Sequence, residues 1–533
     1  MEGFIEEKVW LGLDLSTQQL KSVAINENLE IVCEASVHFD TDLPEFRTVG
    51  GVHRHDDNQT VTAPVLMWIK ALDMLMDRLR VNGLEFGQVA GISGSGQQHG
   101  SVYWKRGARQ TLRNLESSKF LHEQLSLSFV LLESPIWMDS STSKQCRMLE
   151  QHVGGAEQLA EITGSRAYER FTGSQIAKII ETKTECYNQT ERICLISNFL
   201  ACLLIGDYAP IDLSDGSGMN LLDIKKKEWN QQCIEFCRSD LVEKLGDQIV
   251  PSNETIGMVS DYFVERYGFN PQCYVVAFTG DNPASLAGMC LGPNDVAVSL
   301  GTSDTAFISL SSPKPSLDGH VFCNPINENH YMGLICFKNG SLTRERIRNT
   351  CADSSWDIFN QLLESTPRGN FGNIGFYFDM KEIFPVVSGD FRYNRFDAEV
   401  SSFAAEVETR ACVEGQFLRI RIHAESLGFK SGPNTRILAT GGASANQSIV
   451  KVLADVFNAP VYTYSIPNSA VLGSALLAKF AKEKQNISYY DMVLKLNSNF
   501  TLIAKPSSDA GEIYDNMVER YRKLEKRLEN DEA

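Results

Sequence analysis

Residues 9–25, VWLGLDLSTQQLKSVAI, decide the fold because they read as a β-hairpin with an unusual tip. The segments VWLGL and LKSVAI are apolar, as buried strands are, and the small polar residues STQQ between them favour a turn. An acid, Asp14, stands where the first strand meets this turn. A polar tip on an otherwise buried hairpin indicates a ligand site.

The hairpin pattern recurs near the middle of the chain, at residues 296–310, VAVSLGTSDTAFISL. When LDLST is aligned with VSLGTS, Asp14 matches Ser299 and Thr17 matches Thr302. A repeated unit predicts a duplicated fold with a cleft between two lobes.

Segments built from small residues also occur twice, as PASLAGM at 283–289 and NSAVLGSALLA at 468–478. Each places Ala, Ser or Gly at helical spacing, so the two predicted helices can approach closely. We place the boundary between the lobes near residue 291, which gives an N-terminal lobe of residues 1–291 and a C-terminal lobe of residues 292–533.

Composition narrows the class of protein. A chain of 533 residues exceeds one ordinary core, and a formal net charge of −17 disfavours nucleic acid and acidic membrane surfaces. The 13 cysteines form no CxxC pair, which is typical of reduced thiols in a cytoplasmic protein. The first residues do not resemble a signal peptide, and the longest apolar run, 193–205, predicts a buried helix rather than a membrane span. We expect a cytoplasmic monomer or weak homo-oligomer.

Helix and strand signals alternate, which favours the α/β class. Residues 62–80 predict an amphipathic helix with one apolar stripe. Three predicted strands, at 88–93, 273–279 and 436–440, each run into a glycine-bearing polar loop. Ligands in open α/β sheets bind beyond the carboxyl ends of strands, so these loops are the candidate site.

The two hairpin turns suit a phosphate chain, because each presents backbone N–H groups and Gly301 lets the backbone come close. Asp14 is suited to hold Mg²⁺ through water, since Mg²⁺ prefers one or two carboxylates plus phosphate oxygens. The alternative is a pair of ordinary polar turns. The chain has no Walker motif and no dinucleotide-binding motif.

Asp281 lies in TGDNPASLAG, between a predicted buried strand and a helix that begins near Asn282. The field of the helix N-terminus is expected to keep this carboxylate ionised and able to accept a proton. In phosphoryl transfer a positioned Asp commonly takes the proton of the attacking hydroxyl. The alternative is that Asp281 and Asn282 only cap the helix.

Two further loops carry candidate ligand contacts. In ATGGASAN, Gly441 and Gly442 leave a flat surface for a purine or ribose, although a tight turn capped by Ser444 explains them equally well. His99, in GQQHG, and Arg170, in YERF, are suited to bind sugar hydroxyls, although each is also typical of a structural or surface residue.

Taken together, several motifs in one order resemble the FGGY family of carbohydrate kinases, and within it the eukaryotic branch that acts on D-xylulose. The resemblance runs from about residue 9 to about residue 480. The motifs are LGLDLSTQQLK, SGSGQQHGSVYW, SPIWMDSSTSKQCR, SRAYERFTGSQIAKI, FTGDNPASLAGM, VSLGTSDT and LATGGASANQSI. The segments 36–57 and 105–130 look like added loops shared with eukaryotic relatives.

The resemblance implies two ribonuclease H-like lobes of the actin and hexokinase type that close over ATP, Mg²⁺ and the sugar. It implies that Asp281 is the general base and Asp14 the Mg²⁺ acid. The implied sugar contacts are His99, Arg170, Asp281 and Asn282. The implied ATP contacts are Thr17, Gly301, Thr302, Ser303, Trp356, Gly441, Gly442 and Asn446.

Two other functions stay open at this stage. The acceptor sugar of related kinases is ribulose, fuculose, gluconate or glycerol, and residue types alone do not distinguish these from D-xylulose. The same fold also serves as a nucleotide-switched scaffold with no small acceptor, although that function leaves Asp281 and Asn282 unexplained.

Overall fold

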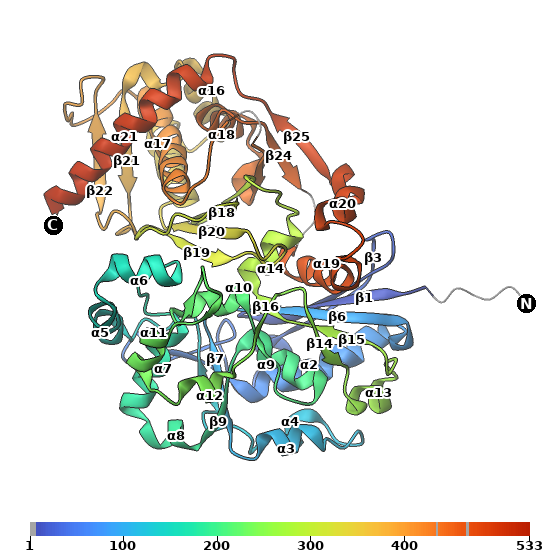
Figure 1. Ribbon diagram of the computed structural model, residues 1–533. Helices are drawn as coiled ribbons and strands as arrows, with labels where there is room; N and C mark the ends of the chain where they lie inside the picture. The colour runs from blue at the N-terminus through green and yellow to red at the C-terminus, as the bar shows by residue number, and fades with distance from the viewer. Residues whose placement is uncertain (1–6, 433–434, 465–467, 533) are drawn as a thin grey trace, which may run out of the picture. The chain divides into compact units, whose positions relative to one another are not determined.

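The computed structural model describes residues 7–432, 435–464 and 468–532, and the chain divides into two compact units (Figure 1). The first unit comprises Met1–Cys290, Phe322–His330 and Pro467–Leu496. The second comprises Leu291–Val321, Tyr331–Ile466 and Asn497–Ala533. The first change of unit falls next to the boundary expected near residue 291, but two later segments return to the first unit.

The opening stretch forms the hairpin that its pattern predicts. Strand β1 (Val9–Leu15) is buried along its whole length and pairs antiparallel with β2 (Gln19–Ile25). Leu15 and Leu20 close the turn, and Asp14 pairs with Lys21 one step earlier. Asp14 is therefore the last but one residue of a central strand rather than a turn residue.

The sheet of the first unit has the order β14-β15-β6-β1-β2-β3, with β16 paired to β6. β1, β6 and β15 run parallel, whereas β2, β3 and β14 are each antiparallel to their neighbours. The predicted strand at 273–279 is interrupted, because it forms two short strands. The remaining strands are β3 (Ile31–His38), β6 (Val89–Gly96), β14 (Thr255–Met258), β15 (Tyr274–Val276) and β16 (Thr279–Gly280).

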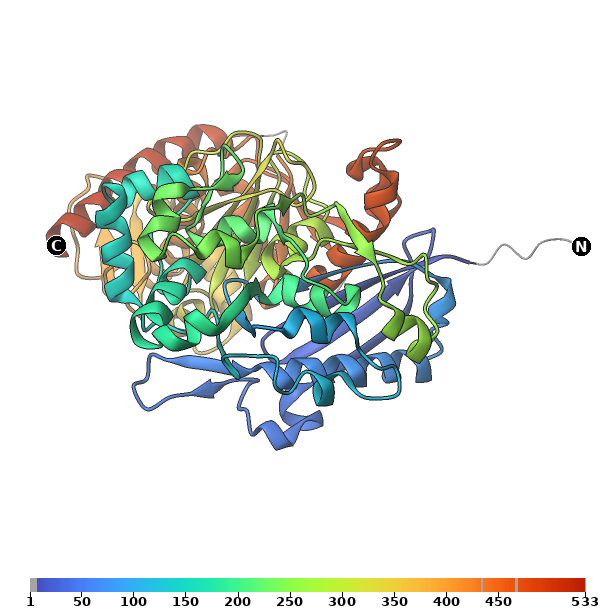
Figure 2. The same ribbon diagram turned by 60° about the horizontal axis from the view of Figure 1, so that its bottom comes forward.

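Helices cover both faces of this sheet (Figure 1). On one face lie α2 (Val65–Val81) and α9 (Ile196–Ile205), and Figure 2 shows the blue strands lying against the blue helix α2. The amphipathic helix expected at 62–80 is thus confirmed. The buried helix expected at 193–205 starts three residues late, because residues up to Leu195 belong to β9 (Thr190–Leu195), which pairs with β7 (Ser101–Lys105).

On the other face, α14 (Asp281–Gly288) and α19 (Ser469–Glu483) pack directly against each other. A Cβ atom on Gly288 would lie 1.9 Å from the Ser469 carbonyl oxygen, and one on Gly473 would lie 1.9 Å from that of Ala284. Gly12 of β1 meets α19 in the same way, 2.3 Å from Val471 O. This backbone contact confirms the close approach of the small-residue helices and explains why a C-terminal segment belongs to the first unit.

The first unit has a second hydrophobic core, which includes Leu149, Ile176 and Ile193 and lies among its shorter helices. One short helix of this part, α10, is capped by Asp212. The helices are α5 (Ser143–Val153), α6 (Ala156–Thr163), α7 (Thr172–Thr182), α8 (Thr184–Gln189), α11 (Gln231–Cys237), α12 (Leu241–Leu245) and α10 (Leu213–Gly216). Of the two segments expected as loops, 36–57 contains α1 (Phe39–Asp42), and 105–130 contains α3 (Ala108–Arg113) and α4 (Leu121–Gln124).

The second unit has a sheet of order β19-β20-β18-β17-β23-β24-β25. The second hairpin is present, with the turn between β17 and β18 closed by the pair Leu300 and Asp304. β17, β23 and β24 run parallel. The strands are β17 (Val296–Leu300), β18 (Asp304–Leu310), β19 (His320–Cys323), β20 (Tyr331–Phe337), β23 (Ile437–Thr440), β24 (Val461–Tyr464) and β25 (Phe500–Ala504).

The 22-residue helix α17 is the central helix of this unit, and it is buried along most of its length. It contacts α15, α16, α18, α21 and the separate hairpin of β21 (Ile374–Phe378) and β22 (Gly389–Tyr393). The helices are α15 (Ser341–Cys351), α16 (Trp356–Ser365), α17 (Ala405–Ser426), α18 (Gln447–Phe457) and α21 (Ala510–Glu532). Among the described residues, no helix combines the length and apolarity needed to cross a membrane.

Candidate active site

Asp14 is a buried carboxylate with few partners. Its Oδ1 atom accepts a hydrogen bond from Ser95 Oγ at 2.8 Å, across the parallel pair of β1 and β6. Burial raises the pKa of Asp14 to about 6, although the Ser95 hydroxyl and the charge of Lys21 oppose this shift. An acid held in this way gains from a cation beside it.

The turn after Asp14 is held in place from two sides. Trp137 Nε1 donates to Thr17 Oγ1 at 2.9 Å, and a Cβ atom on Gly51 would lie 2.0 Å from the Thr17 carbonyl oxygen. Within the described part of the chain, the backbone N–H groups of Thr17 and Gln18 donate no hydrogen bond. Trp137 lies in the motif SPIWMDSSTSKQCR, but the sequence alone does not single it out as a site residue. Its partner Thr17 is 120 positions away in the chain.

Asp281 is the first residue of α14, and its two oxygens differ. Oδ1 accepts from the Gln98 backbone N–H at 3.2 Å, from the Asn282 backbone N–H at 2.9 Å and from Asn282 Nδ2 at 3.3 Å. Among the described residues, none donates to Oδ2. One oxygen is therefore anchored, and the other has its lone pairs available for a proton.

The expectation that the helix N-terminus keeps Asp281 fully ionised needs correction. Burial and the nearby charge of Asp14 raise the pKa of Asp281 to about 7, and the backbone N–H donors oppose them only in part. A pKa near neutral pH suits a general base, which must take a proton in one step and release it in another.

His99 lies one residue beyond Gln98 and is held as a neutral imidazole. Its Nδ1 atom is 2.9 Å from the Gly218 carbonyl, which only accepts, so Nδ1 carries the hydrogen and Nε2 is left as an acceptor. The ring stacks on Phe171 at 4.4 Å between centroids. Burial, with the charge of Arg170 as a second cause, lowers the pKa of His99 to about 3.

Arg170 is partly exposed, and its guanidinium lies over the Tyr168 ring at 5.6 Å. Its effect on the His99 pKa places its charge close to that imidazole. The structure thus brings Asp14, Asp281, Asn282, His99 and Arg170 into one region of the first unit, although they come from four distant stretches of sequence.

The remaining predicted residues lie in the second unit, where a cavity of about 790 Å³ opens beside the second hairpin turn. Its volume is within the range of about 300–1,000 Å³ typical of ligand pockets. Predicted residues that line it are Gly301, Thr302, Trp356, Gly442 and Asn446. Ser303 and Gly441 are not part of the lining.

The adjacent glycines of the loop after β23 have different environments. Gly441 has φ +83°, and a Cβ atom there would lie 2.6 Å from the Leu300 carbonyl oxygen. A Cβ on Gly442 would meet nothing within 4 Å. Gly441 is therefore required by the backbone, whereas Gly442 leaves room at the cavity surface.

Asn446, rather than Ser444, caps α18. Its Oδ1 atom accepts from the Ile449 N–H at 3.1 Å, and its Nδ2 atom donates to Asn360 Oδ1 at 2.9 Å. Asn360 also lines the cavity and was not selected from the sequence, where it is one polar residue of an amphipathic helix. At the start of the same helix, Trp356 lies under the guanidinium of Arg348 at 4.7 Å.

The turn Gly301–Ser303 is fixed by α15. The N–H groups of Gly340 and Ser341 donate to the carbonyls of Thr302 and Gly301, at 3.2 and 2.8 Å. In the described chain, the N–H groups of residues 301–303 themselves donate no hydrogen bond. They are available to an anion.

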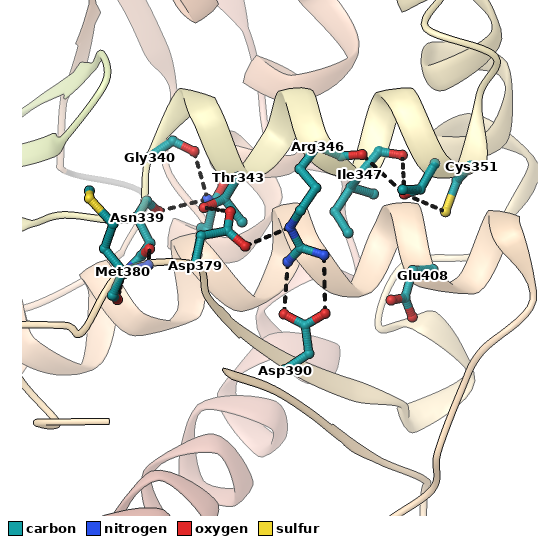
Figure 3. Close-up of polar contacts among 12 residues, drawn as sticks. Asn339, Gly340, Thr343, Arg346, Ile347, Cys351, Asp379, Met380, Asp390 and Glu408 are labelled. Atoms are coloured by element: carbon teal, nitrogen blue, oxygen red, sulfur yellow. Dashed lines mark hydrogen bonds and ion pairs between the residues drawn. The ribbon is translucent and has the colours of Figure 1, made fainter. Parts of the chain in front are cut away.

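Two arginines of α15 hold this helix through ion pairs. Arg344 forms a buried bidentate pair with Asp304, the residue that follows the turn, at 2.7 and 3.0 Å. Arg346 pairs with Asp390 at 2.7 Å and with Asp379 at 2.5 Å (Figure 3). The cavity wall formed by α15 is therefore rigidly attached to β18 and β22.

The residues at the first hairpin fit a magnesium ion. In the described ranges, no three or more His, Cys, Asp or Glu side chains gather as a complete metal site. Mg²⁺ does not need one, since a single carboxylate with waters and phosphate oxygens satisfies it. Asp14, a buried carboxylate that forms no ion pair among the described residues, is such a carboxylate.

Comparison with known proteins agrees with this arrangement. Residues 129–288 match the N-terminal domain, and residues 296–482 the C-terminal domain, of the FGGY family of carbohydrate kinases. Xylulose kinase of Rattus norvegicus is 54% identical over 518 residues, which cover 97% of this chain and 96% of that protein.

Solved structures share the fold at low sequence identity. Xylulose kinase from Rhodospirillum rubrum has a TM-score of 0.78 at 15% identity, covering 98% of this chain and 99% of that one. Gluconate kinase from Lactobacillus acidophilus has a TM-score of 0.76 at 18% identity, covering 98% of both chains.

The fold and the sequence matches define a carbohydrate kinase, an enzyme that transfers a phosphoryl group to a sugar. More narrowly, the chain belongs to the FGGY family of carbohydrate kinases, with the two-domain α/β architecture of that family. The resemblance inferred from the sequence motifs is confirmed.

Proposed function

We propose that the protein transfers the γ-phosphoryl group of ATP to the terminal hydroxyl of D-xylulose, producing D-xylulose 5-phosphate and ADP. The observation that carries the proposal is the state of Asp281, which has one anchored oxygen, one free oxygen and a pKa of about 7. The choice of sugar follows the rat and mouse relatives, each 54% identical and named xylulose kinase.

In the proposed reaction, Asp281 Oδ2 takes the proton of the sugar hydroxyl while that oxygen bonds to the γ-phosphorus. The bond between this phosphorus and the bridging oxygen breaks, and ADP leaves with the electron pair. The three donors on Oδ1 keep the carboxylate oriented, so that only Oδ2 needs to change its protonation state.

The sugar is oriented by residues close to Asp281. His99 Nε2 accepts a hydrogen bond from one sugar hydroxyl, because Nδ1 is committed to Gly218. Arg170 donates to another oxygen, and Asn282 lies beside the reacting hydroxyl. A neutral imidazole and a cation together discriminate hydroxyl positions by their donor and acceptor roles.

In the second unit, the N–H groups of Gly301, Thr302 and Ser303, which donate no hydrogen bond among the described residues, contact the phosphates. In the first unit, Thr17 is the proposed phosphate contact. Gly441, Gly442, Asn446 and Trp356 surround the adenosine, in and beside the 790 Å³ cavity. Asp14 would hold Mg²⁺, whose charge supplies electrostatic stabilisation of the phosphates when it is bound.

The direct test is a coupled assay of ADP release with D-xylulose, ribulose, gluconate and glycerol as separate acceptors. We expect D-xylulose to give the highest kcat/KM, and Asp281→Asn to lower kcat by about three orders of magnitude, since a general base and its charge are both lost. Preference for another sugar would overturn the substrate assignment. A near-normal kcat for Asp281→Asn would overturn the role of the base.

A further inference from the structure

The side chains directly behind Asp281 form a polar cluster that the proposed chemistry does not yet use. It consists of Gln98, which follows β6, and the acids Asp212 and Asp215 of the α10 segment. All three side chains are buried, at 2%, 0% and 1% exposure. Buried polar groups of this kind are costly unless they are paired, so their contacts carry information.

Gln98 makes three hydrogen bonds within this small region. Its backbone N–H donates to Asp281 Oδ1 at 3.2 Å, and its side-chain Oε1 accepts from Asn282 Nδ2 at 2.9 Å. Its Nε2 donates to Asp215 Oδ1 at 3.4 Å. The same residue therefore contacts the carboxylate of the base, the neighbouring amide and the buried acid.

Asp215 is in turn fixed in position. Ser197 Oγ donates to its Oδ2 at 2.5 Å, and its backbone N–H donates to Asp212 Oδ1 at 3.2 Å. Burial, followed by the charges of Asp212 and Asp281, raises the pKa of Asp215 well above its usual range. Both oxygens of Asp215 thus accept hydrogen bonds, and the bond from Gln98 Nε2 fixes the orientation of the Gln98 amide.

The backbone next to Asp281 is adapted to this cluster. A Cβ atom on Gly280 would lie 2.4 Å from Gln98 Cγ and 2.8 Å from Asp215 Oδ1. Only glycine lets the start of α14 come this close to both side chains. The approach brings Asp281 and Asn282 to Gln98.

We propose that Gln98 and Asp215 act as one positioning unit for the phosphoryl transfer: Asp215 orients the Gln98 amide, and Gln98 fixes Asn282 and the Asp281 carboxylate. The proposal rests on the role of Asp281 as the base. Neither residue touches the reacting atoms, so both act through Asp281 and Asn282.

The test uses the full chain with ATP and D-xylulose, and compares Gln98→Ala, Asp215→Ala and Asp215→Asn. We expect each alanine variant to lower kcat by about 10- to 100-fold, because a shift of about 1 Å in a catalytic group has an effect of this size. KM for ATP stays unchanged, since the nucleotide cavity lies in the second unit. Asp215→Asn stays within about threefold of wild type, because the amide oxygen of Asn still accepts the hydrogen bond from Gln98 Nε2.

Two double variants separate positioning from a merely structural role. Gln98→Ala combined with Asp215→Ala is expected to lose no more kcat than Gln98→Ala alone, because the two residues act in series. Gln98→Ala added to Asp281→Asn is expected to leave the residual rate unchanged. Losses that multiply in either double variant would overturn the proposal, as would a wild-type kcat for Gln98→Ala.

Two glycine variants test the same proposal while the side chains of Gln98 and Asp215 remain in place. Gly280→Ala is expected to reproduce the kcat loss of Gln98→Ala, whereas Gly87→Ala, where the nearest atom to a new Cβ is 3.8 Å away, leaves kcat unchanged. If Asp281→Asn keeps a near-normal kcat, the proposed base fails. If that variant is inactive but Gly280→Ala and Gln98→Ala are both normal, only the positioning unit fails.

Discussion

Six strands in the sheet of each unit correspond in order and direction, but the residues beyond their ends differ in chemistry. β3-β2-β1-β6-β15-β14 in the first unit corresponds to β20-β18-β17-β23-β24-β25 in the second. In both, the first strand of an antiparallel hairpin is also the first of three parallel strands, and the strand beyond them is antiparallel. Asp14 and Ser299 occupy the same place, one step before the pair that closes the turn.

The difference lies in what each unit places at this edge of the sheet. The first unit gathers ionisable side chains there, with Asp14 on the hairpin and Asp281 after β16. The second has a glycine-bearing turn with free N–H groups and an open cavity, with Gly441 after β23. Under the proposed function, the first unit supplies acids for the chemistry and the second supplies backbone N–H groups for binding, from corresponding positions beyond the strand ends.

The sharpest way to break this comparison is to substitute each of the matched residues Asp14 and Ser299 in turn. Asp14→Asn is expected to lower kcat by about 1,000-fold, because removal of a charge at a phosphoryl-transfer site costs several kcal/mol of transition-state stabilisation. Ser299→Ala should stay within about threefold of wild type. Steady-state kinetics at saturating Mg²⁺ measures both, and equal effects would show that the two hairpins contribute alike.

A second comparison concerns the residue pair that closes each hairpin turn, and the measured quantity is the free energy of unfolding. The first turn closes on Leu15 and Leu20, both buried, whereas the second closes on Asp304, paired with buried Arg344. Arg344→Met leaves an uncompensated buried carboxylate and should cost about 3–5 kcal/mol of unfolding free energy.

The control variant replaces both partners of the ion pair, so that the second turn closes on apolar residues as the first one does. Arg344→Met combined with Asp304→Leu should recover part of the loss, because replacement of a whole buried ion pair is milder than removal of one partner. Urea denaturation measures both variants. A double variant less stable than Arg344→Met alone would show that the ion pair does more than neutralise Asp304.

Much of this architecture follows from local sequence signals. The hairpins are evident from apolar stretches around polar turns, and the candidate loops from glycines directly after strands. Asp281 and Asn282 stand out because a strand, two polar residues and a helix start follow one another in ten positions. These features depend on residues that are neighbours in the sequence, so one amino-acid sequence is enough to predict them.

Other features depend on contacts between distant residues, which local patterns do not carry. α19 packs into the first unit through close backbone contacts at Gly12, Gly288 and Gly473, and Gly288 and Gly473 are 185 positions apart. Asp215 reads as an ordinary turn residue until Gln98, 117 positions away, is placed beside it. The near-neutral pKa of Asp281 likewise comes from burial and from Asp14, not from the helix that follows it.

A third prediction concerns pH, since the second unit contains a buried charged histidine. His423 of α17 lies 3.3 Å from Asp318 and 3.1 Å from Glu525. Burial lowers the pKa of His423, but these carboxylates outweigh it and raise the pKa to about 9 from a usual 6.5. The folded state therefore holds this proton more tightly than the unfolded state does.

The sign of the effect follows from that difference. The contribution of protonated His423 to the free energy of unfolding is fully present below pH 6.5 and is lost as pH rises to 9. This change is about 3 kcal/mol at most. Hydrogen exchange on α17 peptides between pH 6.5 and 9, corrected for the intrinsic rate, measures it. In His423→Gln this slope should disappear, and a slope that persists in the variant would assign it to other groups.

The smallest expected effect separates the two glycines of the loop after β23. Gly442→Val should raise KM for ATP by about tenfold and leave the melting temperature unchanged, because its side chain enters the cavity without meeting protein atoms. Gly441→Ala should instead lower the melting temperature, since φ +83° and the Leu300 carbonyl oppose any Cβ there. Isothermal titration calorimetry with ATP measures nucleotide binding in both variants. If Gly442→Val binds ATP normally, this cavity does not hold the nucleotide, and the second unit loses the role that distinguishes it from the first.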